Sequence, residues 1–211
     1  MILSPFPSLP QLRQWLGDLD IYLLDLLLKQ PFPAETPVLD AGCGMGRNVT
    51  YLMGAGFPVY GMDLAADDIT YLQQETRRLM PTAPVNRFRV EAVEQHSFPN
   101  DFFGLIISSA VLHFARDAAH FAAMLEAMWR SLRPGGILFV RTASTTGMEA
   151  QLTVSGNGWF GLPDGSQRFL VSDEDLLAAA TRLQAQWVEP LRTVVVHQQR
   201  SMATAVWRKP S

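Results

Sequence analysis

The chain is 211 residues long, 48% of its residues are hydrophobic, and its formal net charge is −3. This length fits one domain with one sizeable core better than it fits two domains. The charge provides no basic field across the whole chain, so we expect no nucleic-acid partner. The single cysteine excludes an internal disulfide and a zinc site built from several cysteines, which favours a reducing, cytoplasmic location.

Residues 1–36 are expected to form a helical cap. Residues 1–10 carry no positively charged leader, and the apolar stretch 21–28 is interrupted by an aspartate and is too short to span a bilayer, so we expect no membrane segment. Leucines recur at helical spacing over residues 11–29, which predicts an amphipathic helix with a break near Gly17. This helix either packs on the core or covers a cofactor cleft.

Residues 37–141 contain short apolar runs that alternate with helical patterns. This alternation is typical of βαβ crossovers on a mostly parallel sheet, so it predicts the cofactor-binding core of an α/β fold. One helix is predicted to begin after Asp117 and to end before the PGG sequence at 134–136. The strands are expected at residues 37–40, 58–62, 88–92, 105–108 and 136–141.

The C-terminal part is predicted to contain an insertion, a helix and a hairpin. Residues 142–171 lack a sustained period and contain five glycines, so they are expected to form a long irregular loop that acts as a lid. Ser172 followed by Asp175 predicts a capping box and a helix over residues 173–186. Residues 172–211 therefore hold this helix and an antiparallel hairpin made of 191–198 and 201–208, and the whole chain is predicted to be one domain.

A glycine-rich turn follows the first predicted strand, in the segment VLDAGCGMGRN (38–48). Three alternating glycines let a ligand approach the backbone closely, which is typical of a nucleoside cofactor site. A purely structural turn is the alternative, because a glycine pattern alone is weak evidence.

Polar side chains also end the next three predicted strands. Asp63 ends the second strand, Glu91 the third, and Ser108 and Ser109 the fourth, and open α/β sheets bind ligands at this edge. A carboxylate after the second strand can accept hydrogen bonds from both ribose hydroxyls, so Asp63 is the leading cofactor residue. Alternatively, Asp63 only caps the following helix.

The detail of the turn helps to distinguish hydride transfer with a dinucleotide from methyl transfer. The dinucleotide fingerprint requires a third glycine where this chain has Arg47, and the bulk of arginine hinders the close approach of a pyrophosphate. An NAD-dependent oxidoreductase therefore becomes the less favoured alternative to a methyltransferase.

Three segments together resemble class I S-adenosylmethionine-dependent methyltransferases: VLDAGCG (38–44), VYGMD (59–63) and LRPGG (132–136). The GMGRN variant (44–48) is most similar to small bacterial enzymes of the tellurite-resistance and thiopurine type. The resemblance implies a Rossmann-like three-layer sandwich, with a seven-stranded, mostly parallel sheet and an antiparallel C-terminal hairpin. It also implies S-adenosyl-L-methionine as the cofactor.

The resemblance assigns cofactor roles to residues at the carboxyl edge of this sheet. In these roles the turn surrounds the methionine moiety, Asp63 holds the ribose, a hydrophobic pair encloses the adenine, and a glutamate receives the adenine amino group. The methionine residues are Asp40, Gly42 and Gly44, the adenine pair is Leu64 and Val93, and the amino group is received by Glu91 or Glu94. Ser108, Ser109 and Ala110 lie beside the donor methyl group. Arg47, Asn48 and Ala92 complete the predicted cofactor set.

Methyl transfer from a sulfonium needs no metal, so we expect catalysis mainly through positioning and exclusion of water. His113 follows the fourth strand, and its unperturbed pKa would suit a general base near neutral pH. This histidine either removes a proton or packs within its apolar turn. Arg47 is predicted in the first turn of a helix, where it meets the cofactor carboxylate or forms an exposed salt bridge.

The acceptor is predicted to be a small molecule with an oxygen, nitrogen, sulfur or metalloid nucleophile. Tyr22, Trp159 and Phe160 are candidates for an apolar wall, with the last two in the lid. Arg141 and Arg168 either steer an anionic substrate or form solvated surface. The protein is expected to be a monomer or a homodimer, and a noncatalytic sensor of the cofactor is an alternative function.

Overall fold

The computed structural model describes residues 6–211, and its centre is one mixed sheet with the strand order β10-β11-β5-β4-β1-β2-β3, to which β9 adds beside β11. Strands β1 to β5 are mutually parallel, whereas β9, β10 and β11 pair antiparallel. The predicted mostly parallel sheet with a reversed C-terminal hairpin is confirmed. The bounds are β1 Val38–Ala41, β2 Val59–Asp63, β3 Phe88–Val90, β4 Phe103–Ser109, β5 Leu132–Ala143, β9 Gln186–Trp187, β10 Arg192–Val196 and β11 Arg200–Arg208.

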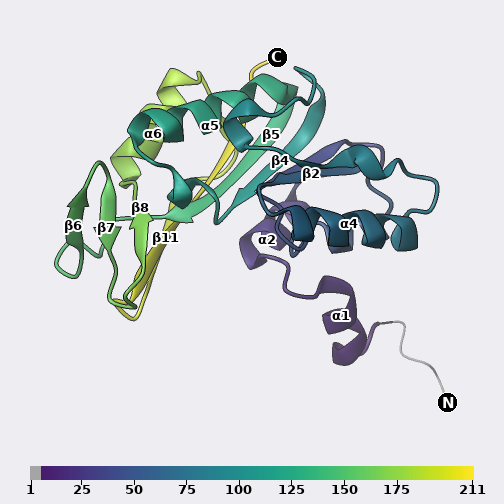
Figure 1. Ribbon diagram of the computed structural model, residues 1–211, viewed down its shortest axis with the longest axis horizontal. Coiled ribbons are helices and arrows are strands. Elements are labelled where there is room, and N and C mark those ends of the chain that lie inside the picture. The colour runs from purple at the N-terminus through teal and green to yellow at the C-terminus, as the bar shows by residue number, and fades with distance from the viewer. Residues whose placement is uncertain (1–5) are drawn as a thin grey trace.

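Helices cover both faces of this sheet, so the fold has three layers (Figure 1). On β4, Ile106 packs on the α5 and α6 face, whereas Leu105 and Ile107 pack on the opposite face, because successive side chains of a strand point to opposite sides. Burial on both faces explains why β4 is apolar along most of its length. One face carries α2 Ile21–Lys29, α3 Thr50–Gly54 and α4 Ala66–Leu79, and the other carries α5 Ala118–Ser131 and α6 Asp173–Arg182.

The N-terminal helical region is broken where the glycine predicted a break. Helix α1 spans Leu9–Leu16 and ends at Gly17, whose φ of +56° is readily adopted by glycine. No residue of α1 is buried, whereas α2 buries Leu23 and Leu26. Only the second half of the predicted helix therefore packs on the core, and α1 extends away from the sheet (Figure 1).

The prediction of an irregular insertion over residues 142–171 is wrong. The segment contains a small antiparallel sheet, made of β6 Thr153–Gly156, β7 Trp159–Gly161 and β8 Gln167–Phe169. Each of these strands has only three or four residues, which is too short for a period of two to stand out in the sequence. The small sheet lies at one end of the molecule, beside β11 (Figure 1).

Several predicted boundaries shift. The capping box at Ser172 and Asp175 is confirmed, but the helix that it starts ends at Arg182, and residues 186 and 187 form β9. Strand β5 begins at Leu132, through the PGG sequence that we expected between elements. Three short 3₁₀ helices complete the described part: η1 Val85–Arg87, η2 Val93–Gln95 and η3 Leu112–Phe114. Across residues 6–211 no helix is long and apolar enough to cross a membrane.

Candidate active site

The turn after β1 is a bare backbone surface. Gly42, Gly44 and Gly46 have positive φ values of +81°, +48° and +85°, in the left-handed region that glycine adopts without a steric penalty. The amides of Gly42 and Cys43 donate to the Met62 carbonyl at 2.8 and 3.0 Å, which ties the turn to β2. A Cβ atom on Gly42 would lie 2.3 Å from a Val111 methyl carbon, so this position requires glycine.

Asp63 lies beside this turn at the end of β2. Its Oδ2 accepts from the Gly44 amide at 2.9 Å, and its Oδ1 accepts from the Ala65 amide at 2.9 Å. The second contact closes a local turn before α4, whose N-cap residue is Ala65 and which has no side-chain cap, so Asp63 does not cap this helix. Because each carboxylate oxygen has two lone pairs, both oxygens retain an acceptor site for a ligand hydroxyl.

A cavity of about 280 Å³, which we call the turn cavity, opens at this edge of the sheet. Leu64 on its rim is 74% exposed, whereas Val93 is 6% exposed, so one predicted adenine neighbour lies on the surface and the other is part of the core. The lining residues are Gly42, Asp63, Leu64, Glu91, Ala92, Val93, Glu94, Ala110, Val111, Phe114, Arg116, His120 and Met124.

The two candidate adenine acceptors differ in their partners. Glu91 accepts from the Ser97 amide at 2.8 Å and from the Ser97 hydroxyl at 2.5 Å. Glu94 lies 3.0 Å from Nε2 of His120. Burial opposes the charged form of Glu94, but hydrogen bonds from backbone and from His120 outweigh it and lower the pKa of this carboxyl. Both carboxylates are therefore held in place at the wall of the turn cavity.

Asp40 is buried beneath the turn with an unsatisfied oxygen. The residue is 1% exposed, and its Oδ1 has no hydrogen-bond partner within residues 6–211. Burial raises the pKa of Asp40 to about 8, although the nearby Arg47 guanidinium acts in the opposite direction. An unsatisfied buried carboxyl is costly for the fold, and a ligand that donates a hydrogen bond would relieve it.

A second cavity of about 310 Å³, which we call the arginine cavity, adjoins the turn cavity at Ala110. Ala110 has φ +64°, an uncommon value for a residue with a Cβ atom, and its amide donates to the Arg141 carbonyl at 2.8 Å. The arginine cavity is lined by Arg47, Ala110, His113, Arg141, Ala143, Leu162, Asp164, Ser166, Arg168, Arg200, Ser201 and Met202.

Asp20 contacts two arginines of the arginine cavity, and the sequence analysis missed it. The residue is 6% exposed, and its Oδ2 lies 3.2 Å from the Ser109 hydroxyl, 3.2 Å from Nη1 of Arg141 and 3.8 Å from Nη2 of Arg47. Its backbone amide donates to Oδ1 of Asn48 at 3.2 Å. The available signal was Asp20 as the residue before an apolar helical run, where its side chain caps α2 through the Tyr22 amide.

His113 lines the arginine cavity but differs from the expected base. It is 8% exposed, and its Nδ1 has no hydrogen-bond partner in the described part of the chain. Burial, together with the positive charge of Arg168, lowers the pKa of His113 to about 4. The expectation of an unperturbed pKa is therefore wrong. Because the pKa is low, the ring is neutral at physiological pH and is only a weak base.

Comparison with known proteins relates part of the chain to methyltransferases. Residues 39–140, about 48% of the chain, match the family model described as a methyltransferase domain. A solved S-adenosylmethionine-dependent methyltransferase from Methanosarcina mazei has the same fold, with a TM-score of 0.71 at 17% identity over 92% of this chain and 99% of that one.

Curated relatives of this chain match over part of their length. A trans-aconitate 2-methyltransferase from Methylobacterium nodulans is 33% identical over 117 residues, which is 56% of this chain and 42% of that protein. A tRNA 5-carboxymethoxyuridine methyltransferase from Escherichia coli is 28% identical over 153 residues, which is 71% of this chain and 58% of that protein. The chain thus spans about half the length of these relatives. The resemblance to tellurite-resistance and thiopurine enzymes stays a prediction.

The family's cofactor, S-adenosylmethionine, fits the residues of the turn cavity. The glycine turn leaves no Cβ atoms in the way, Asp63 retains acceptor sites suited to hydroxyls, and Asp40 offers an unsatisfied oxygen. Eight residues of the predicted cofactor set line this one cavity: Gly42, Asp63, Leu64, Glu91, Ala92, Val93, Glu94 and Ala110.

The remaining predicted cofactor residues lie outside that lining. Arg47 precedes α3, so its predicted position in the first turn of a helix is wrong. Its side chain donates to the Ser109 hydroxyl at 3.1 Å and pairs with Asp20, so it faces the arginine cavity. Ser108 is fully buried, with a hydroxyl that has no partner among the residues the structure describes.

The predicted acceptor residues separate into two groups. Arg141 and Arg168 line the arginine cavity, whereas Tyr22 lies against the Arg141 and Arg192 guanidinium groups, each 5.2 Å from its ring centre. Trp159 lies in β7, and its Nε1 donates a hydrogen bond to the Arg116 carbonyl at 3.0 Å. Phe160 lines a different cavity of about 890 Å³.

The glycine before Trp159 has a packing role. A Cβ atom on Gly158 would lie 2.3 Å from the Phe169 ring, so this glycine allows close packing within the small sheet.

Proposed function

We propose that this protein transfers the methyl group of S-adenosylmethionine to a small molecule bound in the arginine cavity. The observation that carries the proposal is the position of Ala110, which lines both the turn cavity and the arginine cavity. A methyl group can pass directly from one bound molecule to another only where their two binding sites adjoin. The left-handed backbone of Ala110 is a local strain of the kind that collects at functional sites.

The cofactor supplies an electrophilic methyl group when it is bound. In this proposal Asp63 holds the ribose, the glycine turn and Asp40 hold the methionine moiety, and Leu64 and Val93 enclose the adenine. Alignment of two reactants contributes on the order of 7 to 11 kcal/mol, whereas one general base contributes about 10²- to 10⁴-fold. Because His113 is neutral and weakly basic, its proposed role is to orient the acceptor through Nδ1.

The named relatives support more than one kind of acceptor. One is named for trans-aconitate, a small organic acid, and another for a modified tRNA nucleoside. We propose a small molecule, because the chain's net charge of −3 provides no field for a phosphate backbone. We also propose that residues 1–211 act as one methyltransferase domain, since β10 and β11 complete the same sheet as β1 to β5.

The proposal is tested by incubating the purified chain with S-adenosylmethionine and a panel of thiols, amines, phenols, carboxylates and metalloid oxyanions. At least one acceptor should cause release of S-adenosylhomocysteine that saturates with acceptor concentration and is lost in Asp63→Ala. A cofactor sensor would bind the cofactor with no release, and an NAD-dependent oxidoreductase would bind NAD alone. Either of these last two results would contradict the proposed function.

A further inference from the structure

We propose that the methyl acceptor is a small organic anion, held by the guanidinium groups of Arg141, Arg168 and Arg200. This inference rests on the proposed methyl transfer and specifies the class of molecule that occupies the arginine cavity. The sequence contains these arginines at widely separated positions, and it left open whether Arg141 and Arg168 steer an anionic substrate or form solvated surface.

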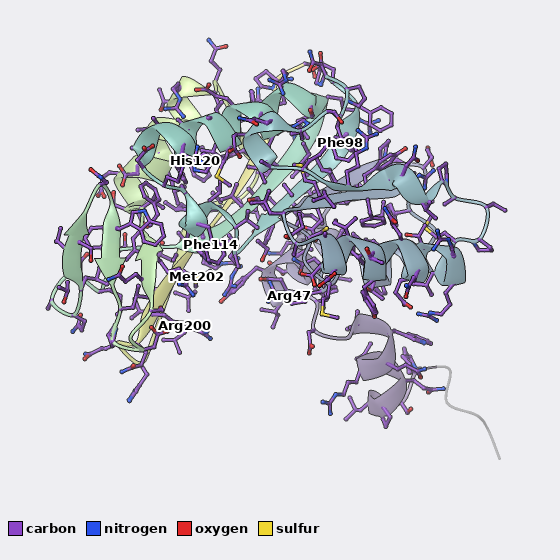
Figure 2. The ribbon with its side chains drawn as sticks, viewed as in Figure 1. Arg47, Phe98, Phe114, His120, Arg200 and Met202 are labelled. Atoms are coloured by element: carbon purple, nitrogen blue, oxygen red, sulfur yellow. The ribbon has the colours of Figure 1, made fainter. Side chains whose placement is uncertain are left out.

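The first argument is the concentration of positive charge. Arg47 follows the glycine turn, Arg141 lies in β5, Arg168 in β8 and Arg200 at the start of β11, yet all four line one cavity of about 310 Å³. Figure 2 shows Arg47 on the α2 and α4 side of the molecule and Arg200 on the β8 and β11 side. Like charges brought together repel each other, so a fold that gathers four guanidinium groups is prepared for an anion.

The second argument is that the nearby carboxylates leave this charge incompletely neutralised. Asp20 lies within 4 Å of the Arg141 and Arg47 guanidinium groups. Asp164 lines the cavity and interacts electrostatically with Arg168 and Arg200, while its Oδ1 accepts from the Ser166 amide at 2.9 Å and from the Ser166 hydroxyl at 2.6 Å. No salt bridge within 4 Å is formed by Arg168 or Arg200 in the described chain.

The third argument is a set of polar atoms that lack partners. Three residues that line the cavity have a buried polar atom with no hydrogen-bond partner within residues 6–211: His113 Nδ1, Arg141 Nε and Ser201 Oγ. Buried polar groups are nearly always paired in folded proteins, and unpaired ones mark a place for a ligand or water. Arg141 and Ser201 both offer donors, as an anionic acceptor requires.

Arg141 is already oriented for this role. Its Nη1 donates to Asp20 at 3.2 Å, and its guanidinium lies 5.2 Å from the Tyr22 ring centre, so the group is fixed on two sides while Nε–H stays free. Arg168 is also fixed, because Nη1 donates to the Gln167 carbonyl at 2.7 Å and the guanidinium lies 5.2 Å from the Phe114 ring centre. A preorganised guanidinium loses less entropy when it binds a carboxylate or phosphate in a forked pair.

The cavity volume limits the anion to a small molecule. A space of about 310 Å³ is at the lower end of small-ligand sites, so it accommodates a compact di- or tricarboxylate, or a small phosphate ester. Carboxylate and phosphate share the chemistry that guanidinium groups recognise, and the experiment separates them.

Calorimetric titration of the protein saturated with S-adenosylhomocysteine tests the inference. The probes are propane-1,2,3-tricarboxylate, its neutral triamide and inorganic phosphate. We expect the tricarboxylate to bind and the triamide not to bind. Arg168→Gln and Arg200→Gln should each weaken binding of the anion roughly tenfold or more, which corresponds to about 1.4 kcal/mol. These two side chains are chosen because neither pairs with buried Asp20, so the fold should tolerate their loss.

Arg78→Gln is the matched control, because Arg78 is an exposed arginine on α4 that pairs with Glu75 outside the cavity. Tighter binding of phosphate than of the tricarboxylate would support the anion site and assign it to a phosphorylated acceptor. Binding of the triamide as tightly as the tricarboxylate, binding of neither anion, or no effect of Arg168→Gln and Arg200→Gln would overturn the inference. Binding of a tRNA in place of both small anions would overturn it as well.

The same experiment keeps this inference separate from the proposed function. Saturation with S-adenosylhomocysteine is measured first. If that product does not bind, the proposed methyl transfer fails; if it binds and no anion follows, only the anionic acceptor is wrong.

Discussion

The two cavities of this protein are built in different ways. The turn cavity is formed largely by residues that follow directly on β1, β2, β3 and β4, among them Gly42 of the glycine turn. The arginine cavity is formed by side chains from the turn after β1, from β5, from the small sheet and from β11. The first is therefore encoded by short contiguous motifs, and the second exists only when distant segments assemble.

This contrast explains why cofactor and acceptor are so unequally visible in the sequence. A backbone surface needs specific residues at fixed spacing, because only glycine adopts the necessary φ values. A side-chain cavity tolerates any arrangement in which a few charged groups converge, so its members have no local pattern. The predictions below test this difference, from the largest expected effect to the smallest.

Gly42→Ala should be the most damaging substitution in the turn cavity. The added methyl group meets Val111 at 2.3 Å and must also adopt φ +81°, so we expect the free energy of unfolding to fall by roughly 2 to 4 kcal/mol, with loss of cofactor binding. Denaturant unfolding measures this. Gly56→Ala is the control, because it has φ +87° with nothing within 4 Å and isolates the backbone strain. Equal losses at both positions would show that close approach is unimportant in the turn.

His113 should make the arginine cavity sensitive to acid. Its folded pKa of about 4 lies below the ordinary value of 6.5, so the unfolded chain binds a proton first as the pH falls. The stability that neutral His113 preserves is fully present above pH 6.5 and is lost as the pH falls to about 4, by up to about 3 kcal/mol.

The measurement compares unfolding of the wild type and of His113→Gln at several pH values, since Asp40, with a pKa raised to about 8, shifts stability in the opposite direction in both proteins. The difference between the two proteins should change between pH 6.5 and pH 4. A difference that stays constant over this range would contradict burial of a neutral imidazole.

Asp20→Asn should weaken the assembly of the arginine cavity. The change removes the charge that neutralises Arg141 at 3.2 Å, and the free energy of unfolding should fall by about 2 kcal/mol. This is less than the loss for a fully buried pair, because the Arg141 side chain is 21% exposed. Asp25→Asn, in an exposed pair with Lys29, should change stability by less than about 1 kcal/mol. If both variants unfold alike in urea, Asp20 is not the central partner described above.

Trp159→Phe should have the smallest effect of the series. The substitution removes the hydrogen bond from Nε1 to the Arg116 carbonyl while keeping an aromatic ring, so the free energy of unfolding should fall by about 0.5 to 1.5 kcal/mol. Faster amide exchange confined to β6, β7 and β8 would accompany it. Unchanged exchange in that small sheet would mean that this bond does not fix it to the rest of the molecule.

The sequence was sufficient for most of the main sheet, because β1, β2, β4 and β5 contain buried apolar runs that alternate with helical patterns. It also placed Asp63, Glu91 and Val93 correctly at the carboxyl edge, since parallel strands end at the same side. It failed for the small sheet, whose strands of three or four residues carry no measurable period.

The properties of individual side chains were the least predictable. The ordinary pKa of histidine suggested a base at His113, and only the folded chain reveals that burial and Arg168 lower this pKa. Asp20 had a local role as a helix cap, but its contacts with Arg141 and Ser109 join residues 121 and 89 positions away in the chain. Such contacts depend on the tertiary arrangement and leave no sequence pattern.

Calorimetric titration with S-adenosylhomocysteine tests the central claim most directly, on the wild type, Asp63→Ala and the control Asp67→Ala, whose side chain is exposed in the first turn of α4. We predict saturable binding to the wild type and to Asp67→Ala. Binding to Asp63→Ala should be weaker by roughly a hundredfold, because two charge-assisted hydrogen bonds are removed. No heat with the folded wild type, or equal affinity in all three proteins, would contradict the account.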